Sequence, residues 1–210
     1  MDVEEVTTRV LDAAEEQFYE RGIQAVGMDA IRARSGVSLK RLYQCFPSKN
    51  HIVAAYLRRR DTRWRTELAE YVRTHGHTPR RAVLAVFDWL SEWFHRPEFR
   101  GCAFVNSFGE LGGVSPAVAK AAREHKEAVA AYLRRLVEPL RVSDPDGLTA
   151  QLTVLLEGSH GGGGGDGRPR GGPRKPRLRR DNARSIPPLL IAYGHLPPGP
   201  RRRWPPRPPQ

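Results

Sequence analysis

Apolar residues recur every three or four positions along most of the first 158 residues, which is the spacing of one face of an α-helix. The first such segment, residues 3–20, ends just before Gly22, a residue suited to the left-handed backbone that often follows a helix. Three later segments begin with a capping side chain followed by proline at the first helical position. These pairs are Thr78-Pro79, Ser115-Pro116 and Asp144-Pro145. No segment has the strict alternation of a strand.

The pattern therefore predicts eight helices joined by short connections, and an all-α fold. We expect them at about residues 3–20, 28–35, 39–45, 49–73, 79–94, 102–111, 116–137 and 145–156. Ser38 is positioned to cap the third helix and Ser48 the fourth. A hydrophobic content of 39% is sufficient for a buried core.

The second and third helices are joined by a tight turn at Gly36, which is the helix-turn-helix arrangement. We expect Ile31, Val37, Leu42 and Cys45 to be buried, so the other side chains of the third helix face outward. Arg, Lys and Gln can read base edges, whereas Tyr, Lys and Ser can bind phosphate oxygens. A further lysine lies at the N-terminus of the fourth helix, where backbone N–H groups favour a phosphate. The predicted DNA-binding residues are Ser38, Leu39, Lys40, Arg41, Tyr43, Gln44 and Lys49.

Four of these residues have an ordinary alternative. Lys40, Arg41 and Lys49 could form a solvated helix face, which is the usual position of surface charge. Tyr43 could belong to the core, but it is adjacent to the inward residue Leu42, which favours exposure.

Composition changes sharply after Gly158. Residues 159–210 hold 12 of the 18 prolines, 10 of the 20 glycines, and twelve cations against two aspartates. This tail carries ten of the twelve net positive charges, which leaves the first 158 residues nearly neutral. We predict a low-complexity, disordered tail. The last apolar helix face stops abruptly, and the composition that follows is typical of GC-rich DNA read out of frame. We therefore hypothesise that the tail is a frameshift product. The alternative is a genuine basic tail.

Several function classes are disfavoured. The sequence has two cysteines and no apolar N-terminal run, which predicts a cytoplasmic protein without a membrane segment. Because we expect it to bind DNA, we also expect it to be associated with the nucleoid. The run GGGGGDG lacks the lysine and following helix of a phosphate-binding loop, and no nucleophile elbow or carboxylate pair is present. The histidines lack metal-site spacing. We expect no enzyme activity, no cofactor and no metal.

The segment RVLDAAEEQFYERGIQAVGMDAIRARSGVSLKRLYQCFPSKNHIV resembles the N-terminal domain of tetracycline-repressor (TetR) type regulators. The resemblance rests on A-x-x-x-F-x-x-x-G from Ala14 to Gly22, G-V-S from Gly36, and L-Y-x-x-F-x-S-K from Leu42 to Lys49. It implies that Leu39, Lys40, Arg41 and Gln44 face bases, while Tyr43 and Lys49 hold the DNA backbone. It also implies a DNA-binding domain at residues 1–50 and an effector-binding and dimerising domain at residues 51–158.

Three departures from this pattern are visible. Gly27 stands where a Thr or Ser often caps the second helix, at a cost of about 1 kcal/mol. Arg32 stands where alanine usually packs on the third helix, so the helix pair must open slightly or the arginine must extend to solvent. The usual dimer interface consists of the last two helices, and only one of them is recognisable here, which should weaken the homodimer.

The apolar faces beyond residue 78 are rich in aromatic residues and contain a few polar groups, a composition that suits a small-molecule pocket. The expected effector-pocket residues are Phe87, Trp89, Trp93, Phe104, Asn106, Phe108 and His125. Plain core packing is the alternative. Cys102 could be a redox sensor, but a buried apolar cysteine is the simpler interpretation.

These observations predict a one-component transcriptional regulator, a repressor that binds a palindromic double-stranded DNA operator and responds to an unidentified small molecule. The rival prediction is a truncated or frameshifted regulator whose arginine-rich tail binds nucleic acid without sequence preference.

Overall fold

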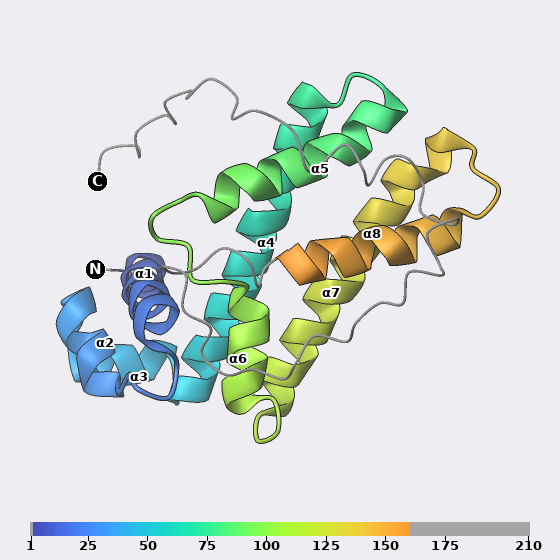
Figure 1. Ribbon diagram of the computed structural model, residues 1–210. Helices are drawn as coiled ribbons and strands as arrows, with labels where there is room; N and C mark the ends of the chain where they lie inside the picture. Colours follow the sequence, from blue (N-terminus) through green and yellow to red (C-terminus); the bar gives the residue numbers. More distant parts are fainter. Residues whose placement is uncertain (1, 160–210) are drawn as a thin grey trace. The chain divides into compact units, whose positions relative to one another are not determined.

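The computed structural model describes residues 2–159, which form an all-α fold without strands in that range (Figure 1). The predicted disorder and frameshift of residues 159–210 concern residues that, apart from Ser159, lie outside this described range. The helices are α1 (Val3–Arg21), α2 (Met28–Ser35), α3 (Leu39–Cys45), α4 (Lys49–His75), α5 (Pro79–Phe94), α6 (Ala103–Leu111), α7 (Pro116–Val137) and α8 (Pro145–Ser159), with a short 3-10 turn at Glu138–Leu140. The predicted fold class is confirmed, and each boundary lies within about three residues of its expected position.

Local capping explains where most helices begin. The hydroxyls of Ser38, Thr78 and Ser115 each accept a hydrogen bond from the N–H three residues later. Asp144 does the same for α8, since its carboxylate accepts from the N–H of Gly147 at 2.8 Å. Such side chains satisfy one of the N–H groups that a helix start leaves unpaired.

Two local predictions were wrong in detail. Gly22 has φ +86° but ψ 153°, an extended conformation rather than the left-handed helical one, because the chain leaves α1 toward the loop before α2. Ser48 precedes α4, but its hydroxyl is 2.8 Å from Nδ1 of His51 instead of capping a backbone N–H.

Two hydrophobic cores meet along α4. The first is built from α1, α2, α3 and the start of α4, together with residues of α6 and α7. The second joins the later part of α4 with α5, α7 and α8. Figure 1 shows α1–α3 gathered at one end and α4 leading from them to α5. The first core also includes Phe104 of α6 and Val118 of α7, so it contains residues from both halves of the described chain.

A cluster of charged side chains also holds α1 against α4. The largely buried carboxylate of Glu15 accepts hydrogen bonds from Arg59 at 3.0 Å and Arg60 at 2.9 Å, and it also pairs with Arg63. The guanidinium of Arg60 lies 4.0 Å from the ring centre of Tyr19. Bidentate and shared arginine contacts of this kind orient two helices as well as stabilise them.

Candidate functional site

The orientation of α3 follows from the residues beneath it. Leu42 and Ile31 are completely buried and Val37 is almost so, which fixes one face of α3 against α1 and α2. Phe46 is buried directly after the helix, whereas Cys45 is half-buried rather than fully inward as expected. Arg32 is 46% exposed and lies beside Asp29, so it extends to solvent and the packing of Leu42 is undisturbed.

The opposite face of α3 is open to solvent. Its exposed residues include six of the seven predicted DNA-binding residues: Ser38, Leu39, Lys40, Arg41, Tyr43 and Gln44. Leu39 and Tyr43 are 43% and 45% exposed, so Tyr43 is not a core residue. The structure thus brings these six residues together on one surface.

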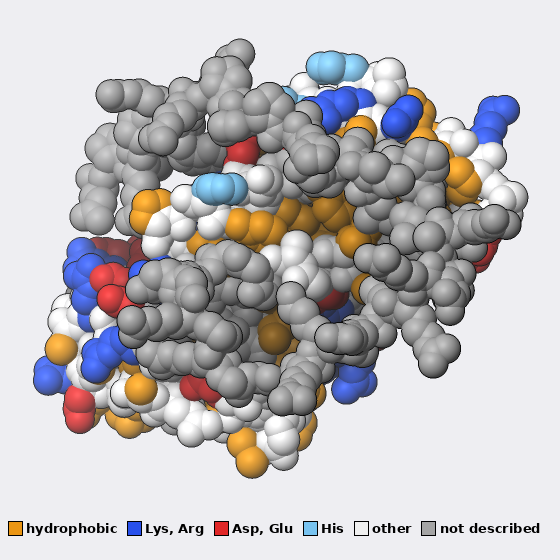
Figure 2. All heavy atoms as spheres, in the orientation of Figure 1, with side chains coloured by type: hydrophobic (Ala, Val, Ile, Leu, Met, Phe, Trp, Pro, Cys, Tyr) orange, Lys and Arg blue, Asp and Glu red, His pale blue; other side chains and the backbone are white. Residues whose placement is uncertain are grey.

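Lys49, the seventh residue, is half-buried in the first turn of α4. Burial lowers the pKa of its ammonium, while the charge of Glu110 acts in the opposite direction. Figure 2 shows basic and acidic side chains interspersed over the α1–α3 end, at the lower left of the view. This mixture agrees with the near-neutral charge of the first 158 residues, so any sequence preference must come from local contacts.

The predicted effector residues separate into two groups. Trp89, Trp93, Phe104 and His125 are buried and, together with Trp64, form an aromatic cluster between α4, α5, α6 and α7. In this aromatic cluster the rings of Trp64 and Trp89 are 5.0 Å apart, and those of Phe104 and His125 stack at 3.7 Å. Trp64 belongs to the apolar stripe of α4 and its role here was not anticipated.

The remaining predicted residues lie elsewhere. Phe87 is half-buried against the second core, and Phe108 is 53% exposed on α6. Asn106 is exposed and donates a hydrogen bond to the carbonyl oxygen of Arg100 at 2.9 Å.

Polar atoms inside the aromatic cluster are only partly satisfied. His125 is 2.7 Å from Asp61 through Nδ1, and burial lowers the pKa of His125 to about 4, so the neutral ring donates this hydrogen bond. Although burial opposes it, hydrogen bonds from Arg65 and His125 lower the pKa of Asp61. The indole Nε1 of Trp89, by contrast, is buried without a hydrogen-bond partner among the described residues. An unsatisfied buried donor is expected to gain from an acceptor on a ligand.

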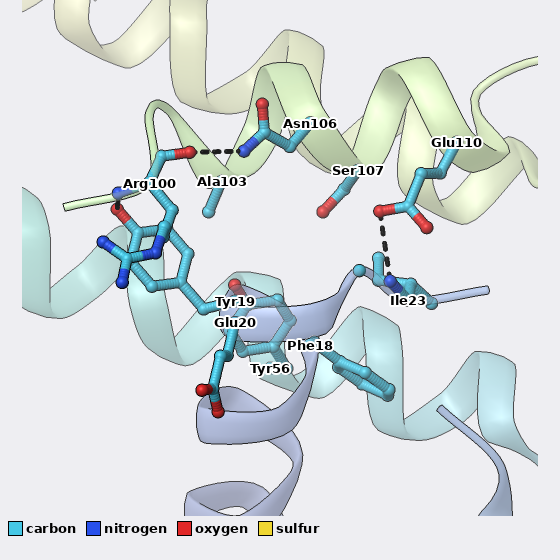
Figure 3. Close-up of a pocket in the computed structure, with 11 residues that line it drawn as sticks. Phe18, Tyr19, Glu20, Ile23, Tyr56, Arg100, Ala103, Asn106, Ser107 and Glu110 are labelled. Atoms are coloured by element: carbon cyan, nitrogen blue, oxygen red, sulfur yellow. Dashed lines mark hydrogen bonds between the residues drawn. The ribbon is translucent and has the colours of Figure 1, made fainter. Parts of the chain in front are cut away.

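A cavity of about 400 Å³ lies where the end of α1 and the start of the following loop face α4 and α6 (Figure 3). We call it the junction cavity. Its lining residues are Phe18, Tyr19, Glu20, Gly22, Ile23, Tyr56, Arg100, Ala103, Asn106, Ser107 and Glu110. Of the predicted effector residues, Asn106 alone belongs to this set.

Hydrogen bonds close both ends of the junction cavity. At one end the hydroxyl of Tyr19 accepts from the N–H of Arg100 and donates to the carbonyl of Gly101, both at 2.9 Å. At the other end the carboxylate of Glu110 accepts from the N–H groups of Ile23 at 3.0 Å and Gln24 at 2.8 Å. Figure 3 shows Tyr19 and Glu110 at opposite sides of the gap. These bonds join α1 and its loop to α6 and the segment just before it.

Neither a metal nor a membrane feature was found in residues 2–159. No three His, Cys, Asp or Glu side chains in this range are grouped so that they could hold a metal ion. No helix in the same range is long and apolar enough to cross a bilayer.

Comparison with known families and curated proteins points to transcriptional regulators. Residues 10–56 match the family described as bacterial regulatory proteins, tetR family, a stretch that runs from α1 to the first part of α4. The HTH-type transcriptional activator FasR of Mycolicibacterium smegmatis is 39% identical over 85 residues, which cover 39% of each chain. The chain therefore aligns with well under half the length of this curated relative.

Solved structures extend the similarity beyond the N-terminal helices. A protein described as a tetR transcriptional regulator from Streptomyces avermitilis is 30% identical, with a TM-score of 0.64 over 74% of this chain and 84% of the other. A TetR-family transcriptional regulator from Streptomyces coelicolor is 28% identical, with a TM-score of 0.70 over 76% and 84%. Reduced NemR from E. coli, at 21% identity and a TM-score of 0.64, covers 74% and 84% and shares the fold alone.

Proposed function

The chain belongs to the TetR family of bacterial transcriptional regulators, and on that premise we propose that it is a one-component repressor that binds a palindromic DNA operator. The observation that carries this proposal is the exposed face of α3, held in place by the completely buried Leu42. We assign residues 1–50 to DNA binding and residues 51–158 to effector binding and dimerisation. The protein acts in the cytoplasm, on the nucleoid.

Each exposed residue of α3 has a role suited to its chemistry. Lys40, Arg41 and Gln44 contact base edges in the major groove, and Leu39 makes the apolar contact. Ser38, Tyr43 and Lys49 hold phosphate oxygens and set the orientation of the helix. The start of α4 favours a phosphate near Lys49 because no side chain caps its first backbone N–H groups.

A palindromic operator requires two copies of α3 at a fixed separation, so we propose a homodimer. The support is α8, which packs one side on the second core through Leu156 while Val154 and Leu155 remain 70% and 38% exposed. A second copy of the same helix is a suitable cover for these apolar side chains. We expect this dimer to be weak, because a single helix supplies most of the apolar area.

We propose that a small apolar effector releases the DNA by entering the aromatic cluster. The unpartnered Nε1 of Trp89 and the surrounding rings support this site, although Asn106 and Phe108 lie apart from it. An effector that binds better to the conformation unable to bind DNA shifts the population toward it.

Activation of transcription is a second candidate, because the similar protein from Mycolicibacterium smegmatis is named an activator. A reporter fused to the region upstream of the protein's own gene separates the two. Deleting the protein raises expression if it represses and lowers expression if it activates.

The test of DNA binding is a salt titration by fluorescence anisotropy, comparing the upstream duplex with a scrambled duplex of equal length. We expect a preference of roughly a thousandfold at physiological salt. Equal affinity for both duplexes, with a steep loss as salt rises, would instead support the rival function, sequence-independent binding by the arginine-rich tail.

Two variants separate base contacts from phosphate contacts. Arg41→Ala should relax the preference for the operator by about 1–3 kcal/mol, because a base-edge contact is lost. Tyr43→Phe should weaken binding to operator and scrambled DNA alike, since one phosphate hydrogen bond is lost. Glu124→Ala, on the exposed side of α7, is the matched control. The residue roles are wrong if Arg41→Ala weakens both duplexes equally.

A further inference from the structure

We propose that the junction cavity is a ligand site of its own, which binds a neutral aromatic molecule carrying a carbonyl or hydroxyl oxygen. Its volume of about 400 Å³ falls within the roughly 300–1,000 Å³ typical of small-molecule pockets. It shares no ring with the aromatic cluster, so the two sites are separate.

Two buried hydroxyls define the centre of the junction cavity. Tyr56 is 1% exposed and Ser107 is 3% exposed, and neither side chain forms a hydrogen bond within residues 2–159. In Figure 3 both oxygens face the gap between α1 and α6, one from each side. Ser107 does not bond back to the carbonyl four residues earlier, as Thr62 and Thr153 do in other helices. Neither hydroxyl oxygen is among the fully buried side-chain atoms that lack a partner, so both reach the surface of the cavity and can bond to an oxygen of a ligand.

The polarity of the lining indicates a neutral ligand. The carboxylate of Glu110 is already bound to two backbone N–H groups, and the guanidinium of Arg100 donates to the carbonyls of Pro97 and Phe99. Burial raises the pKa of the Tyr56 hydroxyl, so it remains a protonated donor. With the lining charges bound to backbone or exposed at the rim, an uncharged oxygen is the group that two hydroxyl donors best accommodate.

The apolar part of the lining selects an aromatic molecule. Phe18 and Tyr56, whose rings pack edge to face at 5.7 Å, line the cavity together with the apolar side chains of Ile23 and Ala103. Gly22 allows close approach here, because a Cβ at this residue would lie 3.2 Å from the carboxylate oxygens of Glu110. A flat ring fits such a space between two helices better than a branched chain.

The position of the junction cavity gives its occupant a mechanical role. The ligand would touch α1 and α4 on one side and α6 on the other, between the Tyr19 and Glu110 hydrogen bonds that already join them. Filling this space changes how α1–α3 sit on α6, and therefore the orientation of α3. This regulatory consequence rests on the proposed function, but the binding site itself does not depend on DNA.

The probe for the test is 4-hydroxybenzophenone, a neutral aromatic ketone with a hydroxyl group, added to the full chain without DNA. Ligand-observed NMR gives its dissociation constant, and near-ultraviolet irradiation attaches the bound probe covalently so that peptide mass spectrometry locates it. We expect saturable binding and labelling of peptides containing residues 18–23, 56 or 103–110. Tyr56→Phe and Ser107→Ala should each weaken binding by about twofold to tenfold.

The variants are chosen so that folding is not at risk. Neither Tyr56→Phe nor Ser107→Ala removes a hydrogen bond that the protein makes, and urea unfolding should show similar stability for both. Tyr132→Phe, a half-buried tyrosine of α7 outside the cavity, is the matched control.

Three results would overturn the proposal: no saturable binding, labelling confined to peptides outside the cavity, or an affinity that neither Tyr56→Phe nor Ser107→Ala lowers. All three results are measured without DNA. Failure of this proposal can therefore be told apart from failure of operator binding in the anisotropy test.

Discussion

The buried His125 should make the stability of this protein depend on pH. Burial lowers the pKa of His125 from 6.5 to about 4, against the opposing effect of its hydrogen bond to Asp61. The unfolded chain therefore takes up a proton near pH 6.5 that the folded protein resists until about pH 4. It follows that the free energy of unfolding falls as the pH decreases through this window.

The size of this effect follows from the shift. At about 1.4 kcal/mol per pKa unit, the full contribution is about 3 kcal/mol, of which about 2 kcal/mol is lost between pH 7 and pH 4.5. His125→Phe preserves a ring for stacking on Phe104 but cannot titrate, so the free energy of unfolding should fall less on acidification. At pH 7 the free energy of unfolding of His125→Phe should be lower than that of the unmodified protein, because Asp61 loses one hydrogen bond while keeping those from Arg65.

Urea unfolding at pH 7, 5.5 and 4.5, followed by tryptophan fluorescence, measures the difference between the two proteins. Titrating groups that do not contact His125 are common to both proteins, so they cancel in the comparison; Asp61 loses the hydrogen bond that lowers its pKa, but that carboxyl titrates below the pH range measured. His77→Gln is the control, because His77 is exposed in the loop between α4 and α5 and should not alter the pH dependence. An identical pH dependence in the unmodified protein and His125→Phe would refute the reasoning.

Three further predictions concern packing and assembly. Leu42→Ala should lower the free energy of unfolding by about 2–5 kcal/mol, whereas Leu39→Ala on the exposed face should change it little; equal losses in urea would contradict the packing of α3. Glu110→Ala should cost about 1–2 kcal/mol by removing two hydrogen bonds to backbone N–H groups, and Glu124→Ala much less; thermal denaturation compares them. Val154→Glu should shift sedimentation toward the monomer, and an unchanged distribution would exclude α8 from the dimer interface.

Local sequence signals were sufficient for the helices. A capping hydroxyl followed by proline, as at Thr78 and Ser115, satisfies or removes the N–H groups that a helix start leaves unpaired, so no distant partner is needed. The outward face of α3 was also predictable, because periodicity placed Leu42 inside and Tyr43 next to it outside. Ser48 shows the limit of such signals, since a neighbouring histidine competes for its hydroxyl.

The effector residues show what local signals do not contain. Composition identified Trp89, Trp93, Phe104 and His125 as a group, and the fold brings them together with Trp64. Phe108 has the same apolar character but lies at the surface, because the helix turns it away from both cores. Which side of an aromatic helix is covered depends on its neighbours, and periodicity in one helix does not specify them.

The sequence by itself determined the order and ends of the helices, the all-α fold and the exposed surface of the recognition helix, because each depends on residues within a few positions of one another. Only the tertiary structure decided where cavities lie. At the ends of the junction cavity, hydrogen bonds join Tyr19 to Gly101 and Ile23 to Glu110, and each pair is more than 80 residues apart in the chain. The hydroxyls of Tyr56 and Ser107 line the same cavity only because the fold packs α4 and α6 close to α1.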